Sequence, residues 1–125
     1  MAKILVVEDD PAILANLSRF LRLEGFEVVT ATNGAEGLRA VSKHRPDLVV
    51  SDLRMPEMDG ETLLTTLRTD ALCADLPVIF LTASADRAER DAKLKLGASD
   101  YLVKPLDLQE LLAAVRKHLP PGSAA

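Results

Sequence analysis

Polar side chains of a few selective types follow the apolar runs of this chain. They are Glu8, Asp9 and Asp10 after the first run, Asp52 after the third, Thr82 after the fourth and Lys104 after the fifth. Carboxylates that lie a few ångströms apart repel one another and raise each other's pKa, so they are better satisfied with a cation among them. Oxygen ligands without His or Cys suit Mg²⁺ or Mn²⁺. If the fold brings these positions together, they predict a site for a hard divalent cation.

The elements that must position these side chains alternate along the whole chain. Short apolar runs rich in β-branched residues predict strands at residues 4–7, 26–31, 48–50, 78–81 and 101–103. Helices are predicted to begin near Pro11, Gly34, Gly60, Ala85 and Asp107. This repeated order indicates an α/β fold with right-handed crossovers, a doubly wound, five-stranded parallel sheet and five helices. Ligands of such sheets bind beyond the carboxyl ends of the strands.

Each polar residue at these strand ends also has a plainer structural interpretation. Asp10 precedes Pro11 and is a good helix N-cap, which leaves Glu8 and Asp9 for a metal. Taken singly, Asp52 could be an ordinary loop acid, the Thr82 hydroxyl could cap a helix, and the Lys104 ammonium could be solvated. Their joint placement at successive strand ends favours a shared site over these separate roles.

Composition excludes several classes of function. The 125 residues fit one domain, and 15 Lys and Arg against 19 Asp and Glu give a net charge of -4, so direct nucleic-acid binding by this chain is not expected. No apolar run approaches the ~20 residues of a membrane span and no signal-peptide pattern is seen, which predicts a cytoplasmic protein. The single cysteine, Cys73, is expected to be a partly buried thiol. Residues 120–125 are expected to be a tail or the start of a linker.

Four motifs in order resemble the receiver domains of response regulators in bacterial two-component systems. They are Ile4-Leu5-Val6-Val7-Glu8-Asp9-Asp10, Ser51-Asp52-Leu53-Arg54-Met55-Pro56-Glu57-Met58-Asp59-Gly60, Leu81-Thr82-Ala83 and Asp100-Tyr101-Leu102-Val103-Lys104-Pro105. The resemblance covers about residues 3–119. It implies a receiver domain over residues 1–119, with the flavodoxin-like strand order 2-1-3-4-5.

The resemblance also implies the chemistry of the site. In similar receivers the acid at the position of Asp52 is the phosphoacceptor, which takes a phosphoryl group from a phosphohistidine of a sensor histidine kinase or phosphotransfer protein. Mg²⁺, or Mn²⁺, is then held by Asp9, Asp52 and the backbone carbonyl of Arg54, with Glu8 acting mainly through bound water. Lys104 pairs with another phosphoryl oxygen. Such a domain is a switch that catalyses only its own phosphorylation and dephosphorylation, and is not an enzyme in the usual sense.

A switch follows from the same resemblance. Thr82 is expected to donate its hydroxyl to a phosphoryl oxygen, and Tyr101 to change rotamer into the vacated space; a static packing role is the alternative for Tyr101. The Lys104–Pro105 peptide bond is expected to be cis, with a trans turn as the alternative. Arg54 and Ser84 occupy positions that modulate hydrolysis of the phosphoryl group. His44 and His118 lie in polar helix ends without metal-ligand spacing and are expected to be solvated.

The surface formed by the fourth helix, the fifth strand and the last helix is the expected output surface. The fourth helix, predicted over residues 85–96, has only a weak apolar stripe, made by Ala85, Ala88, Ala92 and Leu96, and Leu94 lies off it and is expected to be exposed. A homodimer through this surface is one option. The pattern of receivers linked to winged-helix domains is incomplete, because Ala114 and Asp91 occupy two of its positions.

Two other classes of protein with related features fit less well. A flavodoxin needs a hydroxyl- and glycine-rich phosphate loop after the first strand, where this chain has three acids that repel phosphate. A phosphatase of the haloacid dehalogenase type needs a second acid two residues after the nucleophile, where this chain has Arg54. The sequence leaves open whether the receiver acts alone, through a partner, or with an output domain.

Overall fold

A five-stranded parallel sheet organises the computed structural model, which describes residues 2–120. The strands are β1 (Lys3–Val7), β2 (Glu27–Ala31), β3 (Leu48–Asp52), β4 (Val78–Thr82) and β5 (Asp100–Val103). The helices are α1 (Pro11–Leu23), α2 (Gly34–His44), α3 (Gly60–Thr69), α4 (Arg87–Lys95) and α5 (Leu108–His118). The strand order is β2-β1-β3-β4-β5, which confirms the predicted flavodoxin-like topology.

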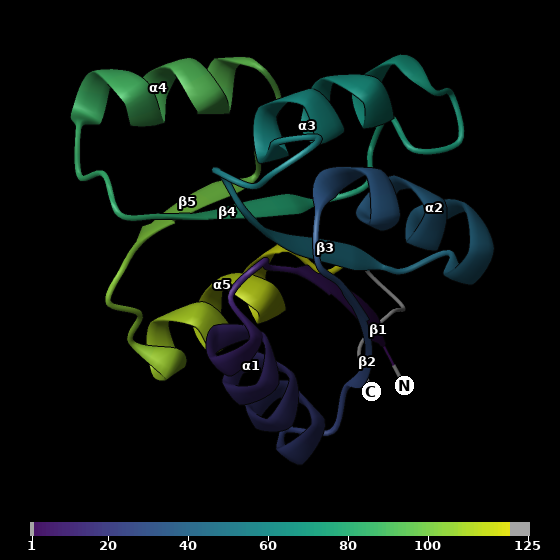
Figure 1. The fold of residues 1–125 in the computed structure, drawn as a ribbon, viewed down its shortest axis with the longest axis vertical. Helices are drawn as coiled ribbons and strands as arrows, with labels where there is room; N and C mark the ends of the chain where they lie inside the picture. The colour runs from purple at the N-terminus through teal and green to yellow at the C-terminus, as the bar shows by residue number, and fades with distance from the viewer. Residues whose placement is uncertain (1, 121–125) are drawn as a thin grey trace.

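Alternating strand residues build two apolar layers on opposite faces of the sheet. In β1, Ile4 and Val6 pack with α1 and α5, whereas Leu5 and Val7 pack with α2 and α3. Figure 1 shows this division: α1 and α5 cover one face, and α2, α3 and α4 cover the other. Because both faces are covered, β3 and β4 are buried throughout, as their continuous apolar sequences predict.

The apolar residues of α1 and α5 recur on one face of each helix, and this face packs against the sheet. Leu17 and Leu21 of α1 are buried, as are Leu111, Leu112 and Val115 of α5. Leu108, the first residue of α5, is 36% exposed. Both helices therefore follow the 3.6-residue period of their sequences.

The predicted start and orientation of α4 are wrong. Asp86 caps this helix, since its Oδ1 accepts hydrogen bonds from the Ala88 and Glu89 N–H groups at 2.8 and 3.4 Å, so α4 begins at Arg87 and not near Ala85. The expected apolar stripe is exposed, including Leu96 at 39%, while Leu94 packs partly buried against the core layer. No residue of α4 is fully buried.

Two further sequence predictions concern membrane spans and the end of the chain. Within residues 2–120, none of the helices is long and apolar enough to cross a membrane. The tail predicted at residues 120–125 lies, beyond Pro120, outside the described residues.

Candidate functional site

The polar residues singled out from the sequence meet at the carboxyl ends of four strands. Glu8 follows β1 and Lys104 follows β5, whereas Asp52 and Thr82 are the last residues of β3 and β4. The apolar runs predict strands that end at residues 50 and 81, so these two strands are longer than predicted. Since neighbouring parallel strands end at one rim, the topology brings positions 96 residues apart into contact.

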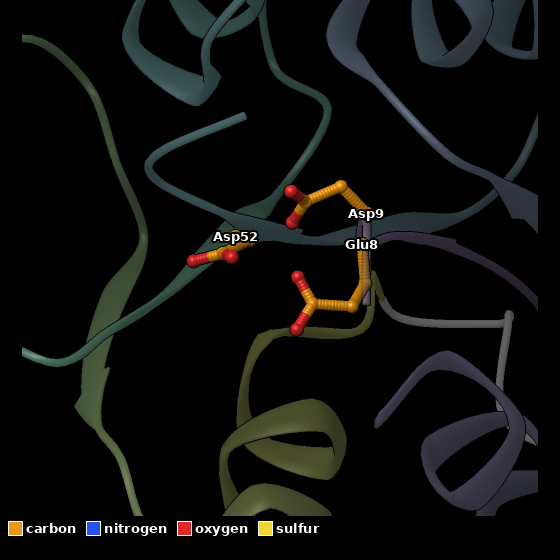
Figure 2. Close-up of side chains that lie close together, drawn as sticks. All are labelled: Glu8, Asp9 and Asp52. Carbon is orange, nitrogen blue, oxygen red and sulfur yellow. The ribbon is translucent and has the colours of Figure 1, made fainter. Parts of the chain in front are cut away.

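Three carboxylates form the centre of this rim. Glu8, Asp9 and Asp52 each offer one oxygen atom within 4.8 Å of the others. In Figure 2 the side chains of Glu8 and Asp9 extend from the end of β1 toward Asp52. The Glu8 side chain is fully buried, Asp52 is 9% exposed and Asp9 is exposed. This set of oxygen donors suits a hard divalent cation.

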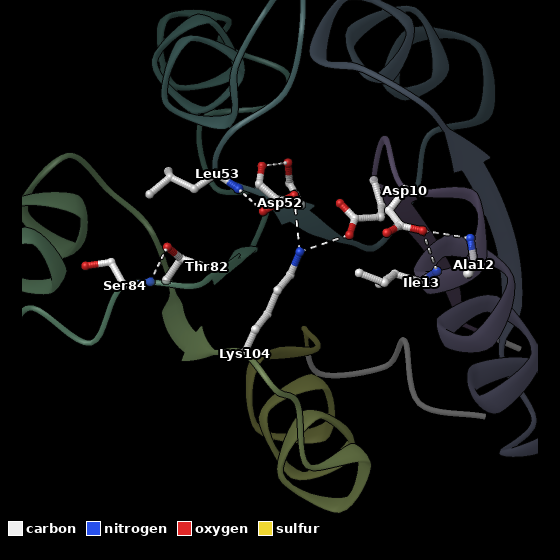
Figure 3. A network of polar contacts seen from close by, with 10 residues as sticks. Asp10, Ala12, Ile13, Asp52, Leu53, Thr82, Ser84 and Lys104 are labelled. Carbon is white, nitrogen blue, oxygen red and sulfur yellow. Dashed lines mark hydrogen bonds and ion pairs between the residues drawn. The ribbon is translucent and has the colours of Figure 1, made fainter.

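The Lys104 ammonium bridges two of these acids. Its Nζ donates to Glu8 Oε1 at 2.9 Å. It also donates to Asp52 Oδ2 at 3.2 Å (Figure 3). Burial disfavours the charged ammonium, but the hydrogen bond to Glu8 and the charge of Asp52 outweigh it and raise the pKa of Lys104. The group is therefore a fixed positive charge at neutral pH.

Glu8 carries the least satisfied group of the site. Its Oε2 is buried and has no hydrogen-bond partner among the described residues. Burial, reinforced by the neighbouring Asp52 and opposed by Lys104, raises the pKa of Glu8 from 4.5 to about 7. One ammonium thus does not neutralise this cluster, and the unpartnered oxygen fits a second cation.

The backbone around Asp52 fixes the orientation of its carboxylate. Asp52 Oδ1 accepts a hydrogen bond from the Leu53 N–H at 2.9 Å, while Oδ2 pairs with Lys104. The loop after β3 packs closely here: a Cβ added at Gly60 would lie 2.5 Å from the Asp52 carbonyl oxygen. Gly60 is therefore required by close approach of the backbone, which explains its place in the motif.

Asp52 borders an open pocket of about 380 Å³, which is also lined by Arg54, Thr82, Ala83, Ser84 and Lys104. Thr82 is only 4% exposed, and its Oγ1 accepts a hydrogen bond from the Ser84 N–H at 3.1 Å. This hydrogen bond leaves the Thr82 hydroxyl proton available for another acceptor. The pocket therefore combines a carboxylate, an ammonium and a hydroxyl donor around a space large enough for a small anion.

Two neighbouring features complete the rim. Tyr101 is buried, and its hydroxyl donates to the Ser84 carbonyl at 3.3 Å, so its ring lies inside the structure next to the loop after β4. The Lys104–Pro105 peptide bond is cis, as the resemblance implies. Asp10 stands apart from the acids of the rim, because its Oδ1 caps α1 through the Ala12 and Ile13 N–H groups (Figure 3).

The prediction that both histidines are solvated is wrong. His118 Nε2 lies 3.1 Å from Asp100 Oδ2, and both side chains are only about one fifth exposed, at 21% and 22%. The last turn of α5 is thereby joined to the first residue of β5. His44 is half-buried, and its carbonyl accepts a hydrogen bond from Lys3 Nζ at 3.0 Å.

Comparison with known proteins agrees with this geometry. The response regulator receiver domain family matches residues 4–116. The chemotaxis response regulator CheY4 of Vibrio cholerae has a TM-score of 0.89 and 33% identity, covering 95% of this chain and 99% of that chain.

Two curated relatives are named as transcriptional regulators. The transcriptional regulatory protein PrrA of Mycobacterium tuberculosis is 50% identical over 114 residues, which are 91% of this chain and 48% of that protein. The DNA-binding dual master transcriptional regulator RpaA of Synechocystis is 40% identical over 116 residues, 93% of this chain and 48% of that protein. The chain spans about half the length of these relatives. With the family match, the strand order and the rim of acids, lysine and threonine in agreement, this chain belongs to the receiver domain family of the response regulators of two-component signalling.

Proposed function

We propose that this domain accepts a phosphoryl group on Asp52 from a phosphohistidine of a sensor histidine kinase or a phosphotransfer protein, in a reaction that depends on Mg²⁺ or Mn²⁺. The observation that carries the proposal is the position of Asp52. Its carboxylate lies within reach of two further acids and a lysine, and it opens onto a pocket with a hydroxyl donor.

The residues present fit a divalent metal. Glu8 Oε2 is buried without a partner, and three carboxylate oxygens lie within 4.8 Å of one another, so a dication satisfies charges that Lys104 alone does not. Asp9 and Asp52 would hold Mg²⁺ directly, with the Arg54 carbonyl as a third ligand and Glu8 acting mainly through water. When bound, the metal supplies neutralisation of the charge that develops on the transferring oxygens.

The chain's own groups account for the transfer step. A carboxylate oxygen of Asp52 forms a bond to phosphorus while the bond from phosphorus to the donor imidazole nitrogen breaks, giving an acyl phosphate and a free imidazole. The Leu53 N–H and Lys104 orient the carboxylate before reaction. Lys104 and Thr82 then pair with two phosphoryl oxygens, which is electrostatic stabilisation by groups already in position. The domain catalyses only its own phosphorylation and dephosphorylation.

The switch follows from the contacts of the loop after β4. Movement of the Thr82 hydroxyl toward the phosphoryl group breaks its hydrogen bond with the Ser84 N–H, and the Ser84 carbonyl is the acceptor for Tyr101. A shift of this loop therefore reaches β5 and the start of α4. We infer that phosphorylation alters the surface of α4, β5 and α5 by biasing an existing equilibrium.

The downstream target of this switch is inferred from the relatives. Two are named as transcriptional regulators and are about twice as long as this chain, which supports an output domain or a protein partner for the switched surface. A homodimer through the same surface is compatible with the partial exposure of Leu96, Val103 and Leu108.

Intact mass spectrometry tests the proposal. With acetyl phosphate and Mg²⁺, the wild-type protein should gain the mass of one phosphoryl group, and omission of Mg²⁺ should suppress the gain. Asp52→Asn should abolish it, and Asp59→Asn, at an exposed acid of the same loop, should not. An unchanged mass gain in Asp52→Asn would show that the phosphoacceptor is another residue.

A further inference from the structure

Arg68 joins three segments of the chain through its guanidinium group. It lies in the last turn of α3, and its Nε and Nη2 donate to the Gly97 carbonyl at 3.2 and 2.8 Å. Its Nη1 donates to the Cys73 carbonyl at 3.3 Å. The charged fork therefore ties α3 to the loop before β4 and to the turn that ends α4. Hydrogen bonds from a charged donor are stronger than neutral ones, so Arg68 holds these three segments together strongly.

The turn at Gly97 is built around this arginine. Gly97 has φ +112, and a Cβ added there would lie 2.9 Å from Arg68 Nε. The Gly97 N–H donates to the Leu94 carbonyl and the Ala98 N–H to the Lys93 carbonyl, both at 3.1 Å, which is the pattern of a glycine-terminated helix. The C-terminal end of α4 is thus closed by its own hydrogen bonds and covered by the stem of Arg68.

The attachments of α4 to the rest of the domain lie in its C-terminal half. Lys93, with a side chain only 15% exposed, pairs with Glu61 of α3 at 3.6 Å, and Leu94 packs against the core layer. In the N-terminal half, residues 87–91 are exposed except for the half-buried Glu89. This end is fixed by the Asp86 cap and by the hydrogen bond from the Asp86 N–H to Ser84 Oγ at 3.3 Å, both local to the loop from Thr82. One end of α4 is held against α3, and the other follows the loop from Thr82.

We propose that Arg68 is a positioning residue that holds the C-terminal end of α4, so that phosphorylation swings the N-terminal half of α4 about Gly97 and does not shift the whole helix. The inference rests on the proposed function, because the displacement originates at Thr82. It differs from that function in naming the fixed point of the motion and the group that fixes it. Without Arg68, the C-terminal end of α4 is held less firmly. Phosphorylation then displaces both ends of the helix.

Residue-resolved NMR of three variants tests the positioning role of Arg68 in the unmodified protein. Arg68→Ala should speed hydrogen exchange of the Gly97 and Ala98 amides about tenfold or more, because the turn that holds these N–H groups on the Leu94 and Lys93 carbonyls loses the charge-assisted hydrogen bonds to the Gly97 carbonyl. Arg68→Lys keeps the charge but cannot donate from three nitrogen atoms, so it should give a smaller acceleration of exchange. Arg19→Ala, an exposed arginine on the opposite face, is the control and should leave these amides unchanged. An amide of β1, such as Leu5, should exchange alike in all variants and so exclude global loss of stability.

The pivot, which is the fixed point of the motion at Gly97, is tested by adding beryllofluoride and Mg²⁺ as a phosphoryl mimic. In the wild type, the amide resonances of residues 88–91 should shift more than those of Gly97 and Ala98, whereas in Arg68→Ala both sets should shift. Equal responses at the two ends of wild-type α4, or exchange at Gly97 that Arg68→Ala leaves unaltered, overturns the inference. If Asp52 and Lys104 themselves show no response in the wild type, the proposed function fails and the pivot falls with it. If they respond while the ends of α4 move alike, only the pivot fails.

Discussion

Glu8→Gln offers a quantitative test of how the acid cluster is built. Burial raises the pKa of Glu8 from 4.5 to about 7, and its side chain is 0% exposed. The folded protein therefore binds a proton on Glu8 more tightly than the unfolded chain does. Between pH 4.5 and 7 the folded state holds this proton while the unfolded state has released it, so stability falls as pH rises through that window.

The size of this effect follows from the difference in pKa. At about 1.36 kcal/mol per pKa unit, a rise from 4.5 to about 7 corresponds to about 3 kcal/mol of unfolding free energy lost between acid and neutral pH. Glutamine cannot ionise, so Glu8→Gln should remove this loss while keeping the shape of the side chain. Mg²⁺ should oppose the loss in the wild type, because it binds the ionised form.

Urea denaturation at pH 5 and pH 8 without divalent ions measures the difference. The wild type should lose about 2.5 kcal/mol more than Glu8→Gln between the two pH values, because the unfolded chain has already released most of this proton at pH 5. Glu110→Gln, at an exposed acid of α5, should behave as the wild type. If wild type and Glu8→Gln lose stability in parallel, Glu8 is ionised throughout and its site is better solvated than the structure indicates.

Three further predictions concern single side chains. Asp9→Asn should weaken Mg²⁺ binding about tenfold or more, measured by titration calorimetry, and unchanged affinity would remove Asp9 from the metal site. Thr82→Ala should leave Asp52 phosphorylatable, as measured by intact mass, but suppress changes in hydrogen exchange across residues 85–110; full changes in this variant would exclude the route through Thr82. Asp10→Ala should lower the unfolding free energy by about 1 kcal/mol through loss of the α1 cap, with Mg²⁺ affinity retained.

Much of the fold could be predicted because its signals are local. The five strands are short apolar runs, and the caps at Asp10 and Asp107 are side chains that bond N–H groups two or three residues away. The rim of acids followed from topology alone, since parallel strands end together. Sequence could therefore locate Glu8, Asp52 and Lys104 at one place without any knowledge of distances.

The missed features depend on contacts that leave little trace in local sequence. Asp86 caps α4 so that the helix begins at Arg87, and Leu94, rather than the alanines of the expected stripe, packs against the core layer. His118 lies in a polar helix end that looks solvated until Asp100 is brought beside it by β5. Arg68 bonds two backbone carbonyls, and an acceptor of this kind has no side chain that a sequence pattern could reveal.

The central claim is that Asp52 is the residue that carries the phosphoryl group. Phosphorylation with acetyl phosphate and Mg²⁺, followed by borohydride reduction, converts an aspartyl phosphate to homoserine, which peptide mass spectrometry can place in the sequence. Homoserine should appear at position 52 alone, and only when Mg²⁺ is present during phosphorylation. Homoserine at Asp9 or Asp59, or none in protein that has gained a phosphoryl group, would contradict the account.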